Sequence, residues 1–225
     1  MGEAIGQVLS FGVGVALSPV PIIGVVLMLG TPRARSNGLA FIAGWILGLA
    51  VVGAAVLLIS SGADASQKAH PAEWVNVLKL LLGLLLLLLA IRQWQARPHS
   101  GEETAMPKWM HTIDSFRPAK AAGFGVLLSA INPKNLLLVV GAAAAIAQTG
   151  TSAGKQAVAL VVFVAIGTLG TGTPVVLYFA MGERSKKLLD GMKGWMAQNN
   201  AAIMSVICLL IGAKLIGDAI SGFSG

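Results

Sequence analysis

The sequence predicts an all-α integral membrane protein whose six transmembrane helices form two inverted three-helix repeats. Three observations support this fold class: a high apolar content, long stretches without charge, and a proline-interrupted segment that opens each half. Of the 225 residues, 56% are hydrophobic and only 11% are charged, whereas a soluble domain has about 25% charged residues. Mean hydropathy is +0.80. These values exclude a soluble globular fold.

The charge-free stretches locate the spans. Asp, Glu, Lys and Arg are absent from residues 36–63, 80–91, 121–133, 135–154, 156–182 and 194–213. Because a spanning helix needs roughly 20 apolar residues, we expect spans at about 4–30, 37–60, 74–95, 119–147, 156–181 and 197–220. Residues 1–225 then form one transmembrane domain, with repeats at 1–95 and 119–225 and a loop at 96–118.

The first and fourth spans share a pattern. Both contain Phe-Gly-Val, at 11–13 and 124–126, and both reach a proline eight or nine residues later, at Pro19 and Pro133. Proline inside a helix removes a backbone hydrogen bond, so each repeat is expected to begin with a broken helix. Three spans per half invert the second repeat, as in many secondary transporters. Non-helical backbone in a membrane survives only against protein or a wet cavity. The two breaks are therefore expected to meet near the midplane and form a site, and two ordinary kinks are the alternative.

The second and third spans differ in their surfaces. Ala40, Gly44 and Gly48 recur every four residues, a spacing that lets helices approach closely, either within one bundle or between two copies in a homodimer. Residues 80–89 are leucines apart from Gly83. A helix that is apolar all round is expected to be peripheral and lipid-facing.

Charge asymmetry predicts the orientation. Eleven of the 16 Lys and Arg residues lie in the connections after the first, third and fifth spans, and four lie on the opposite side. Because positive loops stay cytoplasmic, segment 96–118 is expected in the cytoplasm and both termini outside it. Within this loop, residues 107–116 predict either an interfacial amphipathic helix, with Trp109, Ile113 and Phe116 on one face, or a plain linker.

Lys134 is the most informative single residue, because it lies inside the fourth span, 14 residues beyond Lys120. That separation is roughly 21 Å along a helix, too far for the ammonium to reach an interface. A buried charge in a membrane costs at least about 2.5–3.5 kcal/mol and is functional by default. The alternative role is structural, as a cap for carbonyls that Pro133 frees. No Asp or Glu lies near the middle of any span, so the site is expected to prefer an anion.

Two further features complete the expected site. Asn132 and Asn135 flank Lys134, and their amides both donate and accept hydrogen bonds. The stretch 167–174 carries glycines, threonines and a proline in the fifth span. Its threonines either line the cavity or bond back to their own helix.

Several chemistries are expected to be absent. The single cysteine, Cys208, excludes a disulfide within the chain and a cysteine-based metal centre. No His, Asp, Glu or Cys lies where it could act as a base for Ser18. We therefore expect no enzyme activity, no cofactor, no metal and no nucleic-acid partner.

The motifs resemble a known family. Ser18-Pro19-Val20-Pro21 and Asn132-Pro133-Lys134 are similar to elements of the LysE transporter superfamily. Thr31–Gly38 leading into Phe41–Trp45, and Pro107-Lys108-Trp109-Met110, are similar to its GAP family, the sulfolipid- or peptidoglycolipid-addressing, Sap-like proteins. The resemblance covers essentially the whole chain.

The resemblance implies export of an anionic or zwitterionic lipid or glycolipid across a bacterial plasma membrane toward the cell envelope. Two alternatives stay open: an exporter of a small solute such as an amino acid, and a non-transporting subunit that docks lipid-synthesis or export machinery. The predicted substrate-binding residues are Ser18, Pro19 and Pro21 at the first break, Asn132, Pro133, Lys134 and Asn135 at the second, and Thr171 and Thr173 in the fifth span.

Overall fold

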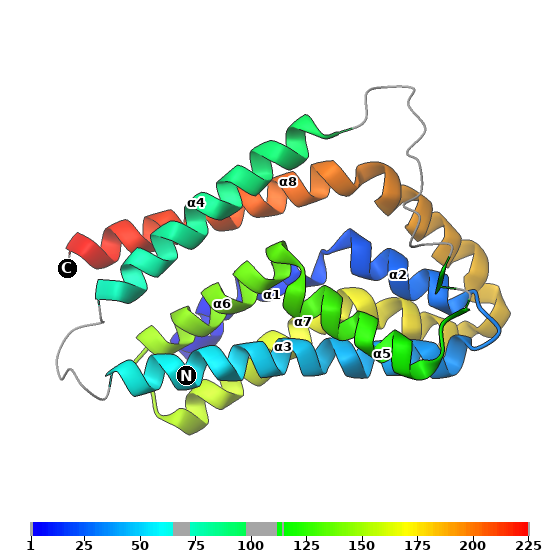
Figure 1. The fold of residues 1–225 in the computed structure, drawn as a ribbon, viewed down its shortest axis with the longest axis horizontal. Coiled ribbons are helices and arrows are strands. Elements are labelled where there is room, and N and C mark those ends of the chain that lie inside the picture. Colours follow the sequence, from blue (N-terminus) through cyan, green and yellow to red (C-terminus); the bar gives the residue numbers. More distant parts are fainter. Residues whose placement is uncertain (1, 65–72, 98–111, 114, 225) are drawn as a thin grey trace.

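The computed structural model describes residues 2–64, 73–97, 112–113 and 115–224, and these residues form helices and short connections without a strand. The all-α prediction is confirmed for this part of the chain (Figure 1). The principal elements are α1 (Gly2–Ala16), α2 (Pro19–Leu29), α3 (Ala34–Asp64), α4 (Glu73–Gln95), α5 (Pro118–Val126), the π-helix η2 (Leu127–Ile131), α6 (Pro133–Gln148), α7 (Ala153–Met181), the 3₁₀-helix η3 (Gly182–Ser185) and α8 (Lys186–Ser224).

The helices fit a multi-pass membrane protein. Three helical runs in the described residues are long and apolar enough to cross a membrane: Ala34–Ser60, Val75–Gln95 and Ala153–Phe223. Two bent pairs also qualify when each is taken as one span, which raises the number to five. A count of six requires the run Ala153–Phe223 to be divided and stays a prediction.

The bent pairs are the two proline segments. Ala4–Ala16 and Pro19–Leu29 meet at 53°, and Pro118–Ile131 and Pro133–Gln148 meet at 63°. Each segment is a broken helix, as the sequence predicted, and not a continuous helix with an ordinary kink, which was the alternative. The prolines stand in the first turn of a new helix, Pro19 and Pro21 in α2 and Pro133 in α6. That position tolerates proline because first-turn N–H groups have no intrahelical partner.

The helices pack in two central pairs and one peripheral pair. In the core, α1 lies against α7 and α5 lies against α3. The second half-helices extend to opposite ends of the molecule, α2 to the right and α6 to the left in Figure 1. The most extensive contact between two helices joins α4 to α8. α4 meets the remaining bundle mainly through α6, and α8 meets it mainly through α2.

Glycines allow the core helices to touch. A Cβ atom on Gly44 of α3 would overlap the carbonyl of Ala122 in α5, and one on Gly170 of α7 would overlap the carbonyl of Ala16 in α1. Gly48 lies equally close to Ser129. Of the two interpretations of the Ala40–Gly44–Gly48 spacing, packing within one bundle is therefore the correct one for both glycines.

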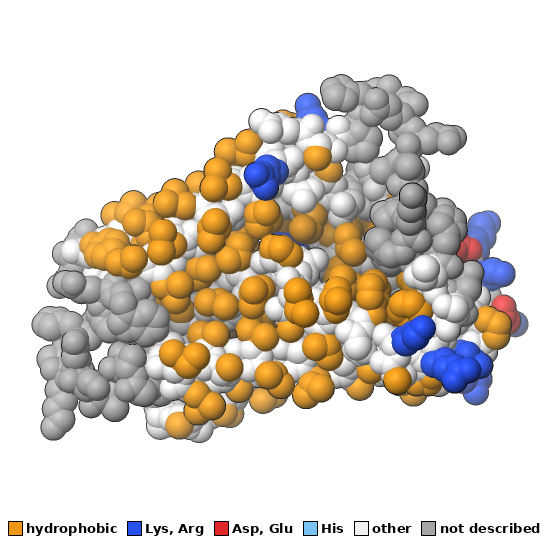
Figure 2. Space-filling model, in the orientation of Figure 1, with side chains coloured by type: hydrophobic (Ala, Val, Ile, Leu, Met, Phe, Trp, Pro, Cys, Tyr) orange, Lys and Arg blue, Asp and Glu red, His pale blue; other side chains and the backbone are white. Residues whose placement is uncertain are grey.

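The flank of the bundle is apolar and one end is basic. Figure 2 shows hydrophobic side chains along the length of the molecule and most of the visible Lys and Arg at its right-hand end, with a smaller number at the upper edge. Leu81, Leu84, Leu85 and Leu88 of α4 are 46–58% exposed, so this peripheral helix presents leucines outward as predicted. The basic end carries exposed residues from the α2–α3 connection, the start of α3, the start of α5, η3 and the start of α8: Arg33, Arg35, Arg117, Lys120, Arg184, Lys186 and Lys187.

Two elements differ from the sequence prediction. α8 begins at Lys186 instead of residue 197, because the intervening stretch contains no proline and buries Leu189 while its lysines stay exposed or half-buried. From segment 96–118, Ile113 is fully buried in the core, and Phe116 packs edge-on against Phe124 at 5.7 Å. These two side chains contact the protein itself, whereas Trp109 lies outside the described residues.

The helix contacts predict an asymmetry between neighbouring glycines. Gly170→Ala should destabilise the protein by about 1–3 kcal/mol, because the new methyl group must displace the backbone of Ala16. Gly172→Ala should be neutral or slightly stabilising, since its Cβ would meet only the Thr168 side chain at 3.8 Å. Thermal melts in detergent, followed by size-exclusion chromatography, measure both variants. Equal melting temperatures would show that α1 and α7 do not meet at Gly170.

Candidate functional site

The two helix breaks meet in the structure, as predicted. Ser18 is the N-cap residue of α2, and Lys134 and Asn135 lie in the first turn of α6. All three side chains are at most 2% exposed. They come from segments more than 110 residues apart in the chain and are joined by hydrogen bonds between side chains. We call Ser18, Lys134 and Asn135 the junction cluster.

Lys134 bridges the first break. Its Nζ donates to the carbonyl oxygen of Gly14 at 2.6 Å and to Oγ of Ser18 at 2.7 Å. Gly14 lies in the last turn of α1, where carbonyls lack intrahelical partners, and the negative end of the helix dipole favours a cation. Lys134 therefore caps the C-terminus of α1, although the sequence suggested carbonyls beside Pro133 for such a role.

Asn135 bridges both breaks. Its Nδ2 donates to the carbonyl of Leu128 at 2.9 Å, and its Oδ1 accepts from Oγ of Ser18 at 2.9 Å. Leu128 lies in η2, a π-helical turn of the kind frequently found at functional sites. Asn132 is the N-cap of α6, because its side-chain Oδ1 accepts a hydrogen bond from the backbone N–H of Lys134.

The charge of Lys134 is balanced by no carboxylate in the described residues. Its two acceptors are neutral oxygens, and the ion pairs in this part of the chain, Lys193–Asp190 and Lys214–Asp218, involve other lysines. An ammonium has three N–H donors, so one remains beyond the two used on Gly14 and Ser18. An anion can replace either neutral acceptor and supply the missing charge.

α8 packs against the first break, beside the junction cluster. Ile207 and Ile211 lie so close to Gly14 that a Cβ there would touch both. Cys208, on the same helix, is fully buried. The three side chains of the cluster are buried in this closed conformation.

The predicted threonines stand apart from this network. Thr171 and Thr173 bond back to the carbonyls of Thr168 and Leu169 in α7, and Thr173 is exposed. The alternative in which they bond to their own helix matches these contacts. Their stretch still borders the first break, because Gly170 touches Ala16 at the end of α1.

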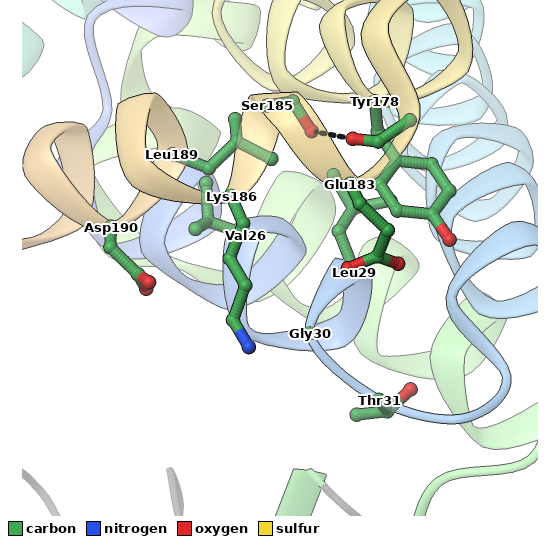
Figure 3. Close-up of a pocket in the computed structure, with 11 residues that line it drawn as sticks. Val26, Leu29, Gly30, Thr31, Tyr178, Glu183, Ser185, Lys186, Leu189 and Asp190 are labelled. Carbon is green, nitrogen blue, oxygen red and sulfur yellow. Dashed lines mark hydrogen bonds between the residues drawn. The ribbon is translucent and has the colours of Figure 1, made fainter.

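A cavity opens at the basic end. It has a volume of about 120 Å³ and lies between the C-terminal end of α2, Tyr178 of α7, η3 and the start of α8. In Figure 3 the side chain of Lys186 extends between those of Glu183 and Asp190, near Gly30. Ser185 is held by its hydrogen bond to the carbonyl of Gly182 at 2.7 Å. The cavity and the junction cluster thus lie at opposite ends of α2.

Sequence reasoning missed the acceptor of Lys134. The Gly14 carbonyl carries no signal in its residue type, and only the position of α1 relative to α6 makes it the lysine's acceptor. No three His, Cys, Asp or Glu residues in the described ranges are placed to hold a metal ion.

Comparison with known families identifies a match over most of the chain. Residues 8–221 match the family described as Sap, sulfolipid-1-addressing protein. No curated protein and no solved structure matches this sequence.

The junction cluster predicts that the Ser18 hydroxyl is structurally important. Ser18→Ala should lower stability by about 1–3 kcal/mol, because Asn135 Oδ1 loses its donor and Lys134 loses an acceptor in buried surroundings. Thr173→Val removes a hydroxyl that is exposed and bonded within its own helix, and should change stability by less than about 0.5 kcal/mol. Thermal melts of the two purified variants compare them. Indistinguishable melting temperatures would contradict the bridging role of Ser18.

Proposed function

We propose, from the premise that this chain belongs to the Sap, sulfolipid-1-addressing protein, family, that it exports an anionic or zwitterionic lipid or glycolipid toward the cell envelope. The family indicates a role in lipid export or addressing. The observation that carries the transport assignment is Lys134, a buried cation at the junction of two broken helices with only neutral acceptors. The proposal assigns no catalytic residue.

The chemistry of Lys134 supports an anionic headgroup. Burying an ammonium in a membrane protein is costly, and neutral oxygens offset that cost less well than a carboxylate, phosphate or sulfate, because hydrogen bonds between two ions are stronger. A headgroup that enters the junction cluster would displace Ser18 or Gly14 and pair with Lys134. Release of the headgroup restores the closed network seen in the structure.

The placement of the half-helices supports a path through the molecule. From the junction cluster, α2 leads over 11 residues, roughly 16 Å, to the cavity at the basic end. In the opposite direction α6 extends over 16 residues, roughly 24 Å. The cluster thus lies between the two ends of the bundle, where alternating access places a substrate site.

Corresponding contacts in the two halves support the six-span inverted repeat. The pairing of α1 with α7 corresponds to that of α5 with α3, and the pairing of α2 with α8 corresponds to that of α6 with α4. The close approaches of Gly170 to Ala16 and of Gly44 to Ala122 correspond in the same way. This symmetry agrees with membership of the LysE superfamily and its GAP family.

The division of the last helical run yields the sixth span. The run Ala153–Phe223 has 71 residues, about 107 Å of helix, which exceeds three bilayer thicknesses of about 30 Å. It contains Gly182 with φ of 56°, at the turn where α7 ends and η3 begins. We assign the fifth span to α7 and the sixth to the apolar part of α8.

The basic end is assigned to the cytoplasm of a bacterial cell. Its exposed arginines and lysines are gathered at one end (Figure 2), as positive-inside sorting requires. The start of α1 and the end of α8 lie at the other end (Figure 1) and are assigned to the outside. The cavity in Figure 3 then opens to the cytoplasm.

Reconstitution separates the alternatives. Liposomes containing the purified protein should move fluorescent phosphatidylglycerol between leaflets, measured by quenching with dithionite. An exporter of small solutes would instead release trapped amino acids, and an accessory subunit alone would move neither.

Lys134 variants test the site in the same liposomes. Lys134→Met should slow transfer of phosphatidylglycerol about tenfold or more, because the charge-assisted contact with the headgroup is lost. Lys134→Arg should also be impaired, since a guanidinium does not reproduce the geometry of an ammonium, and Lys134→Glu should be worse than Met. Lys155→Met, which removes an exposed lysine, is the matched control. Normal transfer by a Lys134→Met protein that melts much lower would make the lysine structural.

Orientation is tested with two introduced cysteines. Ser36→Cys lies at the basic end and Ser152→Cys precedes α7 at the opposite end, and both positions are exposed. An impermeant maleimide added to intact cells should label residue 152 but not residue 36. The native Cys208 is buried and should contribute little background. The reverse labelling pattern would overturn the assignment of the basic end to the cytoplasm.

A further inference from the structure

A second buried lysine lies at the far end of α6. Lys79 of α4 is 6% exposed, and apart from Lys134 it is the only Lys or Arg in the described residues that is buried. It lines a cavity of about 160 Å³ that lies among α1, α4, the C-terminal end of α6 and α8. The cavity is bordered mainly by polar side chains: Gln7, Asn76, Lys79, Gln148, Thr149 and Asp218.

The direction of Lys79 is unusual for its place in the span. A lysine near the end of a transmembrane helix normally extends its ammonium to water. Lys79 instead turns into the protein, where Nζ donates to Oε1 of Gln148. Gln148 is oriented by its own bond from Nε2 to Oδ1 of Asn76 at 3.1 Å. A buried, pre-oriented network therefore holds the cation at the cavity.

Capping of α6 does not account for this arrangement. Two of the last carbonyls of α6 accept hydrogen bonds from other groups, Ile146 from the backbone and hydroxyl of Thr149, and Ala147 from the N–H of Gly150. Lys79 contacts the side chain of Gln148 and not these two carbonyls. The two carbonyls are thus capped without Lys79.

The described side chains around the cavity carry more positive than negative charge. Asp218, which also borders the cavity, forms an ion pair with Lys214 at 2.6 Å. Lys214 additionally donates to Oε1 of Gln7 at 3.3 Å. Among the described side chains here, two cations face one carboxylate, and Lys79 is the cation without an ion pair. Its environment therefore resembles that of Lys134, a buried ammonium held by neutral oxygen.

We infer that this cavity is a second binding site for the anionic headgroup of the amphiphile, at the non-cytoplasmic end of the path. The inference rests on the proposed function and deepens it. An apolar cavity of about 150 Å³ holds benzene, so the Lys79 cavity has room for about six non-hydrogen atoms, the size of a phosphate or sulfate ester. The amides of Gln7, Asn76 and Gln148 supply further donors to its oxygens.

The distance between the two lysines suits a relay. Lys134 lies at the start of α6, and the partner of Lys79, Gln148, lies at its end, 14 residues later. That separation is roughly 21 Å along the helix. A headgroup that leaves Lys134 toward the outside thus meets a second cation before release.

Lipid binding to the full-length protein in detergent tests this site. Native mass spectrometry with short-chain phosphatidylglycerol should show at least about tenfold weaker binding for Lys79→Met, as expected for loss of a charge-assisted hydrogen bond. Binding of phosphatidylcholine should change much less. Lys155→Met removes the same charge from an exposed position at the same end and should bind like the wild type.

A second variant separates binding from folding. Lys79→Met leaves Gln148 without its donor, whereas Lys79→Gln removes the charge and keeps an N–H donor for Gln148, so it should melt closer to the wild type. Weak lipid binding by the stable Lys79→Gln variant would support the site, and wild-type binding would overturn it. If inorganic phosphate binds the wild type as tightly as phosphatidylglycerol does, the cavity is a site for a free anion, and the headgroup assignment is overturned. Retained binding in Lys79→Met together with loss in Lys134→Met would reject this inference while leaving the proposed function intact.

Discussion

Every interrupted helix in a membrane must satisfy the backbone groups that the interruption frees, and the structure meets this constraint at both breaks with side chains from the start of α6. Lys134 of α6 caps the carbonyl of Gly14 in α1, and Asn135 of α6 caps the carbonyl of Leu128 in η2. Ser18 joins the two side chains. The two halves are therefore bonded together at their breaks, where backbone groups would otherwise lack hydrogen-bond partners. Each unsatisfied backbone group in hydrocarbon costs several kcal/mol.

The same bonds give the junction cluster a dual character. In the closed conformation Lys134 serves as a cap, and in the proposed mechanism it is also the group that meets an anionic headgroup. These roles are compatible because a carbonyl, a hydroxyl and a headgroup oxygen are all acceptors for one ammonium. In the closed conformation Ile207 and Ile211 of α8 lie against Gly14, beside the cluster.

Close glycine contacts join the core helices. α3 with α5, and α7 with α1, approach so closely at Gly44 and Gly170 that a Cβ atom there would overlap the facing backbone. α4 instead presents leucines to the surroundings and meets that core mainly through α6. At this meeting point lies the network of Lys79, Gln148 and Asn76. The cavity of Lys79 thus lies between the core and the peripheral pair of α4 and α8.

The sequence by itself determined the apolar, membrane-type character of the helices, the broken first helix of each half and the presence of a lone charge, Lys134, at the second break, because these depend on composition, proline positions and one charge in an apolar stretch. It also indicated that Gly44 and Gly48 pack closely, but not against which helix. Only the tertiary structure decided that Gly14 is the acceptor for Lys134, that Thr171 and Thr173 bond to their own helix, and that Lys79 turns inward. A carbonyl looks the same in every residue, and a lysine near a helix end snorkels or turns inward according to its neighbours. Those neighbours come from distant segments, so no local pattern in the sequence records them.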